Sequence, residues 1–596
     1  MLRTADCGSL REQHIGSHQT LAGWVGRRRD HGGIIFVDLR DRSGVVQVVL
    51  NPELSPEAYQ VAEQLRAEWV VQIKGTVRRR PAGSENPAMD TGTVEVVADE
   101  ANVLNPSLTP PFYIAEDAGA DESLRLRYRY LDLRRPPMQR ILALRHQVVK
   151  FIRDFLDARG FLEIETPILI KSTPEGARDF LVPSRLQPGK FYALPQSPQQ
   201  LKQLLMVSGV EKYFQIARCF RDEDLRADRQ PEFTQLDLEM SFVEEEDVLQ
   251  LTEELYTGLV EYIKPDKKLV KPFPRLTYDQ ALSWYGTDKP DLRFGLRMTD
   301  VSDLAKETEF RVFLSTVEHG GIVKGFVAPG LAHYTGSALR ELEEAARAAG
   351  AAGLSHIRLR GVGALNAVGE EDILFSAGLR MPAEWSRRLA FRMGAGPGDL
   401  VLLMAGPAKQ VNTWLSSMRS YLGECLALTD PDALAFAFIT QFPLFEWSED
   451  ANRWDSSHHP FTSPAEAQED LLEGSELGSI KSKAYDLVCN GSELASGSIR
   501  IHRRELQEKV FRILGYTQEE IDRRFGHILE AFEYGAPPHG GIAPGIDRLV
   551  AILCGAGSIR DVIAFPKTQS GADLLFDSPA PVTQGQLDEL ALRISE

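Results

Sequence analysis

Short runs of β-branched and aromatic residues, separated by clusters of turn residues, fill the N-terminal part of the chain. Such runs predict β-strands. The five runs are Leu21–Val25, Ile34–Leu39, Val45–Leu50, Trp69–Val77 and Val94–Leu104. Five strands in a segment this short predict a small closed barrel, and the OB-fold is a common nucleic-acid-binding barrel of that size.

Beyond this segment the pattern becomes mixed. Apolar residues recur at steps of three and four from Ile141 to Leu156, which predicts an amphipathic helix, and Gly160 follows as a stop signal. Short strands and helices then alternate as far as Phe242, without the regular rhythm of a doubly wound parallel sheet. Residues 281–430 are rich in Ala and Gly and lack dense polar motifs. We interpret them as an inserted domain, with the segments before and after it forming a single domain.

The pattern therefore predicts an α+β multidomain chain. The expected parts are a barrel (1–104), an acidic Pro-containing linker (105–122), a first half-domain (123–280), the inserted domain (281–430) and a second half-domain with a C-terminal extension (431–596).

Composition narrows the class of protein. A chain of 596 residues has room for several cores, and no uncharged apolar run approaches the roughly 20 residues of a membrane span. Five scattered cysteines without a C-x-x-C pair disfavour a disulfide framework or a Cys-based zinc site, and they fit a reducing cytosol. Residues 1–11 lack the apolar core of a signal peptide, so we expect no export.

The charge balance gives a conflicting signal. The net charge of −18 argues against a nucleic-acid partner, because binding to phosphates needs clustered Lys and Arg. The predicted barrel nevertheless carries two arginine runs, Arg27–Arg29 and Arg78–Arg80. These runs either bind nucleic acid or only solubilise strand ends.

Neither common glycine-rich nucleotide motif is present, and the run Gly394–Gly398 is most simply a turn. Three other segments could hold ATP, namely Phe161–Pro167, Cys219–Glu239 and Gly540–Val550. In the second segment, the period of two puts Arg221 and Glu223 on one strand face. In the third, small residues allow close approach of a ligand, and Arg548 can hold a phosphate.

These three segments resemble motifs 1, 2 and 3 of the class II aminoacyl-tRNA synthetases, and with an OB barrel they resemble subclass IIb. Further runs resemble the bacterial-type aspartyl-tRNA synthetases: Ser172–Phe180, Gln196–Lys202, His458–Phe461 and Asn490–Arg500. The similarity covers essentially the whole chain, since the insertion resembles the GAD domain of bacterial members. It implies an OB-fold anticodon-binding domain and an antiparallel-sheet catalytic domain.

The resemblance implies an enzyme that joins L-aspartate to tRNA(Asp) in two steps. Aspartate attacks the α-phosphate of ATP to form aspartyl-adenylate, and the 3′-terminal ribose of tRNA then takes the acyl group. Cations must offset the converging negative charge, and Arg221 and Arg548 are the expected catalytic residues. The implied ATP contacts are Arg221, Asp222, Glu223, Gln230, Phe233, Glu493, Gly545, Ile546, Asp547 and Arg548. Asp486 and Glu493 are the implied Mg²⁺ ligands.

A side-chain carboxylate calls for a bidentate Arg and a supporting Lys, and the resemblance assigns these roles to Arg500 and Lys202. The full implied aspartate set is Glu175, Ser197, Gln199, Lys202, Arg221, Asp237, His458 and Arg500. His458, in a loop with His459, would close over the bound amino acid. Without the resemblance, Lys202 and Arg500 would be interpreted as surface salt-bridge residues.

In the barrel, the resemblance assigns anticodon contacts to Arg29, Phe36, Gln47 and Glu95. A core Phe and ordinary surface polar residues are the alternative interpretation. His31 and Gly83 resemble the non-discriminating type, which also charges tRNA(Asn); neutral loop variation is the alternative.

Several competing functions stay open at this point. Lysyl specificity is disfavoured, because it needs an acidic pocket where Lys202 and Arg500 stand, whereas asparaginyl specificity is harder to exclude. A tRNA-independent adenylating enzyme would have no use for the barrel, and a pure nucleic-acid-binding protein leaves the catalytic-looking segments unexplained. Motif 1 usually builds a homodimer interface in this class, so we expect a homodimer. The cysteine pattern leads us to expect a cytoplasmic location.

Overall fold

The computed structural model describes residues 1–172, 176–376, 378–466 and 468–594. The chain forms two compact units. One comprises residues 1–145, 225–227 and 556–581, and the other comprises residues 146–224, 228–555 and 582–596. Within the described ranges, no helix is long and apolar enough to cross a membrane.

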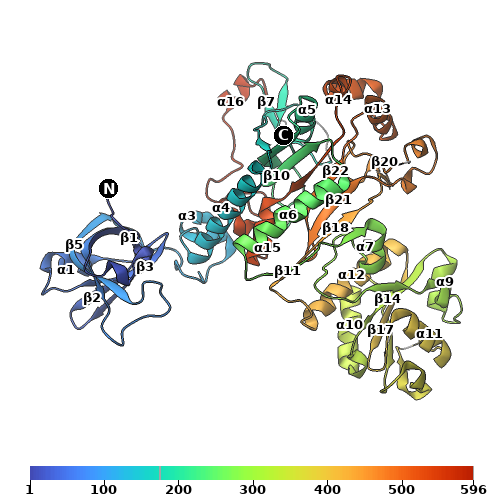
Figure 1. Cartoon of the computed structure of the whole chain (residues 1–596), viewed down its shortest axis with the longest axis horizontal. Helices are drawn as coiled ribbons and strands as arrows, with labels where there is room; N and C mark the ends of the chain where they lie inside the picture. The colour runs from blue at the N-terminus through green and yellow to red at the C-terminus, as the bar shows by residue number, and fades with distance from the viewer. Residues whose placement is uncertain (173–175, 377, 467, 595–596) are drawn as a thin grey trace. The chain divides into compact units, whose positions relative to one another are not determined.

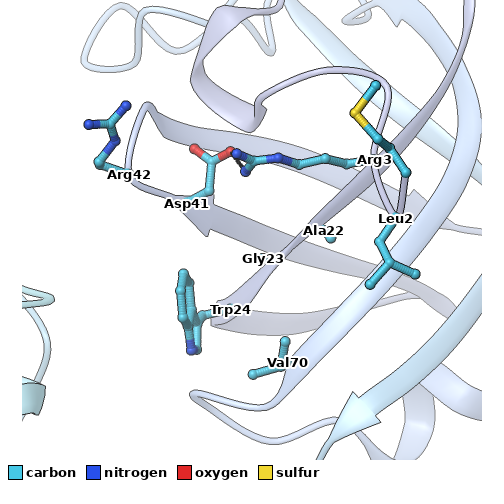
Figure 2. Close-up of a pocket in the computed structure, with 9 residues that line it drawn as sticks. Leu2, Arg3, Ala22, Gly23, Trp24, Asp41, Arg42 and Val70 are labelled. Atoms are coloured by element: carbon cyan, nitrogen blue, oxygen red, sulfur yellow. Dashed lines mark hydrogen bonds and ion pairs between the residues drawn. The ribbon is translucent and has the colours of Figure 1, made fainter.

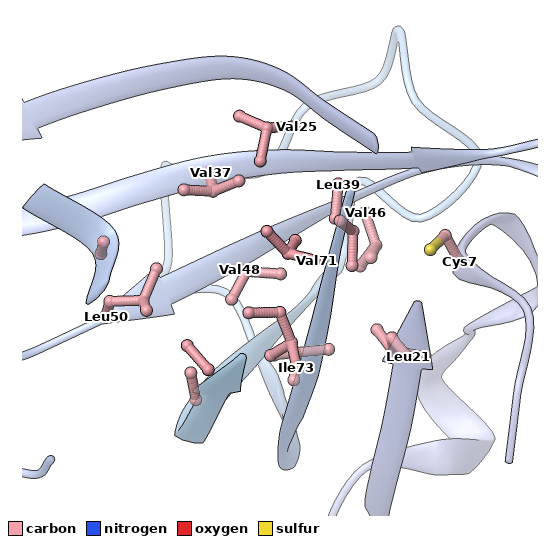
Figure 3. Packing of buried hydrophobic residues seen from close by; sticks show 14 of the residues in the cluster. Cys7, Leu21, Val25, Val37, Leu39, Val46, Val48, Leu50, Val71 and Ile73 are labelled. Atoms are coloured by element: carbon pink, nitrogen blue, oxygen red, sulfur yellow. The ribbon is translucent and has the colours of Figure 1, made fainter. Parts of the chain in front are cut away.

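The N-terminal unit contains the predicted barrel (Figure 1). Its strands close in the order β1-β2-β3-β5-β4, which confirms the OB-type prediction. They are β1 (His18–His31), β2 (Ile34–Asp41), β3 (Gly44–Leu50), β4 (Val70–Arg79) and β5 (Val94–Asn105), with α1 (Pro56–Gln64) between β3 and β4 in the chain. Val37, Leu39, Val46 and Val48 fill the interior (Figure 3). Because strand residues alternate, Phe36 and Asp38 face the outside of the barrel.

Helices α2 (Glu122–Arg127), α3 (Arg129–Asp132) and α4 (Pro136–Asp157) follow the barrel. Helix α4 confirms the predicted amphipathic helix. It begins at a proline, whose fixed φ suits a first turn, and its Val148, Ile152 and Leu156 are buried. Gly160, with φ of +78°, lies just beyond its end, a conformation that favours glycine.

The second unit is built on a nine-stranded sheet, in the order β11-β18-β21-β22-β23-β10-β9-β6 with β12 also paired to β18. The central six strands are antiparallel, namely β18 (Ala433–Thr440), β21 (Ala484–Cys489), β22 (Ser492–Ile499), β23 (His539–Pro544), β10 (Glu232–Ser241) and β9 (Lys212–Phe220). Three short strands pair in parallel, namely β6 (Leu162–Glu163), β11 (Lys268–Val270) and β12 (Arg275–Thr277). Strand β10 pairs with β23, so the segments before and after the insertion form one sheet, as predicted.

The helices of this part are α5 (Gln199–Val207), α6 (Glu245–Ile263), α7 (Tyr278–Tyr285), α13 (Arg504–Ile513), α14 (Gln518–Phe532), α15 (Ile546–Cys554) and α16 (Gln584–Glu589). Two small hairpins complete it, β7 (Leu181–Pro183) with β8 (Phe191–Ala193) and β19 (Phe445–Ser448) with β20 (Arg453–Ser456).

The inserted segment has its own antiparallel sheet, in the order β13-β14-β17-β15-β16. Its strands are β13 (Met298–Asp300), β14 (Ile322–Ala328), β15 (Ser355–Leu359), β16 (Ile373–Phe375) and β17 (Leu400–Gly406), and its helices are α8 (Ser302–Ala305), α9 (Arg311–Glu318), α10 (Gly336–Ala348), α11 (Ala383–Met393) and α12 (Ala408–Cys425). Gly394, at φ of +73°, ends α11, so the glycine run is a turn before β17. Helix α7 packs with the nine-stranded sheet. The predicted limits of the inserted domain, residues 281 and 430, stay predictions.

Candidate active site

A buried cluster of four charged side chains lies where α5, β10 and β22 meet. The Lys202 ammonium is 2.7 Å from Oδ1 of Asp237 and 3.3 Å from Oε2 of Glu239. Arg500, directly after β22, donates from Nε to Oε1 of Glu239 at 2.9 Å and from Nη2 to Oε2 at 3.2 Å. Asp237 and Glu239 share one face of β10 through the strand's period of two. All four side chains are at most 2 % exposed.

The charges within this cluster balance one another. Burial would raise the pKa of Glu239, but the Arg500 and Lys202 charges outweigh it and hold that pKa below its usual range. Burial raises the pKa of Asp237, although Lys202 opposes the shift. Oδ2 of Asp237 is buried and receives no hydrogen bond of ordinary geometry from the described residues. The cluster therefore offers two fixed cations for a carboxylate and a free carboxylate oxygen for an ammonium group.

Two histidines pack beside Arg500. Nη1 of Arg500 lies 2.7 Å from Nε2 of His459, and Nδ1 of His458 lies 2.9 Å from the Ser496 hydroxyl. Burial lowers the pKa of His458 to about 4, and burial together with the Arg500 charge holds the pKa of His459 well below 6.5. His458 is already packed edge-on against Phe442, with ring centroids 4.6 Å apart. Its closing over a ligand stays a prediction.

Arg221 and Phe233 form the expected base- and phosphate-binding corner. Arg221 follows β9, and its Cζ lies 5.1 Å from the centroid of the Phe233 ring at the start of β10. Both side chains are only partly buried, so a face of the ring can stack on a base.

The loop between β9 and β10 carries the other predicted contacts of this corner. Glu223 accepts a 3.1 Å hydrogen bond from Arg229, the backbone of Asp222 accepts from and donates to Arg178, and Gln230 is 2 % exposed. The predicted ATP contacts of Asp222, Glu223 and Gln230 are untested.

The start of α15 lies beside the start of β10, next to this corner. Gly545 donates its N–H to Leu494 O at 2.8 Å, and Arg548 donates from Nη1 to the backbone oxygen of Glu493 at 2.7 Å. Ile546 is fully buried, and the Asp547 carboxylate accepts the Thr234 N–H at 2.9 Å. Asp547 therefore fixes α15 onto β10, which positions Arg548.

Asp486 on β21 and Glu493 on β22 are the predicted metal ligands. Burial, and then the Glu493 charge, raise the pKa of Asp486 well above its usual value. Oδ1 of Asp486 is buried and accepts no hydrogen bond from the described part of the chain. No group of three or more His, Cys, Asp or Glu side chains in the described ranges could hold a metal alone. Mg²⁺ is usually bound by one or two protein carboxylates together with oxygens of the substrate's phosphates. Asp486 and Glu493 fit this pattern.

Sequence reasoning missed two residues of this site. Glu239 fixes both Lys202 and Arg500, and its spacing of two from Asp237 was the available signal. Lys289 lies between α7 and β13, and its Nζ is 2.6 Å from Oε2 of Glu493.

Two predicted aspartate contacts occupy the start of α5. Gln199 donates to Oε1 of Gln203 at 3.2 Å, and Ser197 precedes the helix. Glu175 lies outside the described residues. The flanking loop is held by Gln196, which bonds Ala177 and Asp179.

The predicted anticodon residues lie together on the barrel. Arg29 donates to Asp38 at 2.6 Å and to Gln47 at 3.3 Å, and Gln47 donates to Glu95 at 2.8 Å. Phe36 pairs with Arg29 across β1 and β2 and lies outside the barrel core, so it is not a core Phe. Three polar side chains and one partly buried aromatic ring outside the barrel core suit contacts with splayed-out bases.

Three arginines of the barrel's two runs pair with carboxylates. Arg29 pairs with Asp38, Arg78 with Glu95 at 2.8 Å, and Arg79 with Glu12 at 2.7 Å. Arg28 and Arg80 donate instead to the backbone oxygens of Ala62 and Val94.

His31 ends β1, and its ring lies edge-on to Phe36 at 6.2 Å. Gly83 lies in the loop after β4 with φ of +85°, where a side chain would have open space but a strained backbone. His31 therefore lies beside one of the predicted base contacts.

A largely apolar pocket of about 600 Å³ opens elsewhere on the barrel (Figure 2). Trp24, Val70 and the Arg3–Asp41 ion pair line it, and Arg3 lies 3.4 Å from Asp41. None of the predicted anticodon residues contributes to it.

Two family models match the chain. The model of class II tRNA synthetases (D, K and N) covers residues 121–569, and the model of OB-fold nucleic acid binding domains covers residues 19–104. Among curated relatives, an aspartate–tRNA(Asp/Asn) ligase of Dehalococcoides mccartyi (strain CBDB1) is 56 % identical over 100 % of this chain and 99 % of its own. A protein of the same name from Moorella thermoacetica is 53 % identical over 99 % of this chain and 96 % of its own.

Solved structures agree on the fold. The asparaginyl-tRNA synthetase of Pyrococcus horikoshii, complexed with asparaginyl-adenylate, superposes with a TM-score of 0.59 at 19 % identity, covering 95 % of this chain and 99 % of that one. The aspartyl-tRNA synthetase of Entamoeba histolytica gives a TM-score of 0.56 at 19 % identity, covering 95 % and 91 %. The family models, the full-length relatives and the antiparallel sheet agree, and the chain belongs to the class II tRNA synthetases (D, K and N).

Proposed function

We propose that this protein ligates L-aspartate to tRNA(Asp) and also to tRNA(Asn), using ATP. The names of the full-length relatives support both tRNAs. The observation that carries the amino-acid assignment is the buried cluster of Lys202, Arg500, Asp237 and Glu239. Its two cations suit a side-chain carboxylate, and the free oxygen of Asp237 suits the α-ammonium group.

In the proposed reaction, an α-carboxylate oxygen of aspartate forms a bond to the α-phosphorus of ATP, and the bond to the β-phosphate breaks, which releases pyrophosphate. A ribose hydroxyl of the tRNA 3′ end then attacks the acyl carbon, and AMP leaves. Arg221 offsets the charge where carboxylate and α-phosphate meet, and Arg548 holds the terminal phosphate. Phe233 stacks on adenine. Asp486 and Glu493 would hold Mg²⁺, which would offset the negative charge of the phosphates.

The proposal also covers anticodon binding by the barrel, the oligomeric state and the location of the protein. The barrel binds the anticodon through Arg29, Phe36, Gln47 and Glu95. Leu162, Ile168 and Leu169 in or beside motif 1 are 55, 48 and 52 % exposed in the single chain, which supports a homodimer that covers them. A cytoplasmic location follows from the proposed substrates.

The amino-acid assignment is tested by ATP–pyrophosphate exchange with aspartate, asparagine and lysine in turn. We expect exchange with aspartate and at most about a hundredth of that rate with asparagine, because a neutral amide lacks the charge-assisted contacts that a carboxylate makes with Lys202 and Arg500. Faster exchange with asparagine would favour the asparaginyl alternative. No exchange with any amino acid would favour a binding protein.

The relaxed tRNA choice is tested by charging purified tRNA(Asp) and tRNA(Asn) transcripts. We expect rates within about tenfold of each other, and His31→Leu to lower tRNA(Asn) charging relative to tRNA(Asp) by about tenfold, because His31 contacts the base-stacking Phe36. His18→Leu, on the same strand but paired with Asp99, is the matched control and should leave the ratio unchanged. Wild-type charging of tRNA(Asn) slower by several orders of magnitude would refute the relaxed type.

The rate of aspartate activation should show no titration of His458 or His459 near neutral pH. His458 has a pKa of about 4 and the pKa of His459 is also well below 6.5, so both rings stay neutral as the pH falls through 6.5. Protonation, which would place a cation beside Arg500, begins only on approach to the lowered pKa. We therefore expect no acid limb near 6.5 when exchange is measured from pH ~5.5 to ~8. A limb there that His459→Gln abolishes would contradict this.

A further inference from the structure

Residues 287–297, here called the strap, connect α7 to β13 and so join the catalytic sheet to the inserted domain. Gly286, with φ of +70°, ends α7. From α12, the buried Arg419 donates to the backbone oxygens of Asp291 at 2.7 Å, Phe294 at 2.8 Å and Gly295 at 2.8 Å. Three bonds from one guanidinium fix the strap onto the inserted domain.

The other side of the strap lies on the turn between β21 and β22. A Cβ added to Gly491 would be 3.7 Å from Cβ of Asp291, so the two backbones run close together here. This approach brings the Lys289 side chain from the strap to Glu493, with Nζ 2.6 Å from Oε2. The Lys289 side chain is 39 % exposed and that of Glu493 27 %, so solvent and ligands reach the pair.

Lys289 is the closest cation to this carboxylate. Nη1 of Arg548 is 3.9 Å from Oε1 of Glu493, whereas the ammonium of Lys289 is in hydrogen-bonding contact. Asp288 and Asp486 add negative charge around the pair. Among the described residues, loss of Lys289 would leave Glu493 with the longer contact to Arg548.

We propose that Lys289 is a tethered cation, which neutralises Glu493 in the free enzyme and leaves this carboxylate when Mg²⁺ binds there with ATP. The inference rests on the metal site of the proposed function. A metal ion and an ammonium group on the same carboxylate repel each other and compete for its lone pairs. Because the strap is fixed to α12 through Arg419, Lys289 ties the metal site to the inserted domain.

The test is the affinity of the full-length protein for Mn²⁺, measured by electron paramagnetic resonance with a non-hydrolysable ATP analogue. Lys289→Met removes the competitor, and we expect Mn²⁺ to bind about fivefold to tenfold more tightly than to the wild type. Lys289→Gln should act in the same direction, and Lys289→Arg, which keeps the charge, should remain near the wild type. Lys481→Met is the matched control, because Lys481 forms an exposed pair with Asp279 at 2.7 Å. It should leave Mn²⁺ affinity unchanged.

A double variant, Asp486→Asn with Glu493→Gln, separates failure of this inference from failure of the metal site. If it binds Mn²⁺ as well as the wild type does, the metal site itself is wrong and the inference falls with it. If the double variant loses binding while Lys289→Met and Lys289→Gln bind Mn²⁺ no better than the wild type, the metal site stands and the tethered cation is overturned. Tighter binding by both neutral variants supports the proposal.

Discussion

Arg500→Met should lower kcat/KM for aspartate in ATP–pyrophosphate exchange by about a thousandfold or more. The guanidinium is 2 % exposed and bonded to both oxygens of Glu239, so it is fixed before any ligand arrives. A methionine of similar length leaves the incoming carboxylate without this cation. It also leaves Glu239 buried with only Lys202, and the loss of one partner of a buried pair costs about 3–5 kcal/mol of folding stability.

Loss of binding and loss of stability can be separated in this variant. Adding Glu239→Gln to Arg500→Met removes the uncompensated charge, so thermal stability should largely recover while exchange stays lost. Exchange and melting temperature are measured on the same samples, with Asp, Asn and Lys as substrates. Exchange within about tenfold of the wild type in Arg500→Met would show that Arg500 does not hold the substrate.

Arg221→Ala should lower kcat/KM for aspartate in ATP–pyrophosphate exchange by a comparable factor, about a thousandfold, with little change in folding stability. The side chain is partly exposed, lies over the Phe233 ring at 5.1 Å, and is offset from the buried cluster. Substitutions at such positions change stability by no more than about 0.5 kcal/mol. Its charge acts where carboxylate and α-phosphate converge, so exchange should fall while tRNA binding by the barrel persists.

Arg218→Ala is the matched control for Arg221. Arg218 lies on β9, three residues before Arg221, pairs with Glu232 at 2.6 Å, and has no proposed contact with substrate. Exchange by this variant should stay close to the wild type. Equal losses in both variants would point to general disturbance of β9 rather than to a specific role of Arg221.

The local elements were the predictable part of the fold. Runs of β-branched and aromatic residues located the five barrel strands, and the three- to four-residue spacing located α4. The sequence resemblance supplied what local pattern could not. Lys202 and Arg500 read alone as surface salt-bridge residues, yet the structure buries both, because Asp237 and Glu239 on β10 compensate their charges.

Contacts between residues that are far apart in the sequence could not be predicted from it. Lys289 lies on a connecting segment without a motif, and only the close passage of the strap over Gly491 brings it to Glu493. The net charge of −18 likewise gave the wrong indication about nucleic acid, because a whole-chain sum says nothing of the anticodon surface.

The pairing of β10 with β23 bears on how the protein is made. Leu238 pairs with Ile542, so during synthesis β10 remains an open sheet edge until the ribosome has passed almost the whole chain. Unpaired strand edges invite association with other chains. The inserted domain has its own sheet and cores, so it can fold in the interval. ATP-binding competence is thus acquired late in translation, and a truncated nascent chain that ends before motif 3 carries Lys202, Arg221 and Arg500 but no Arg548.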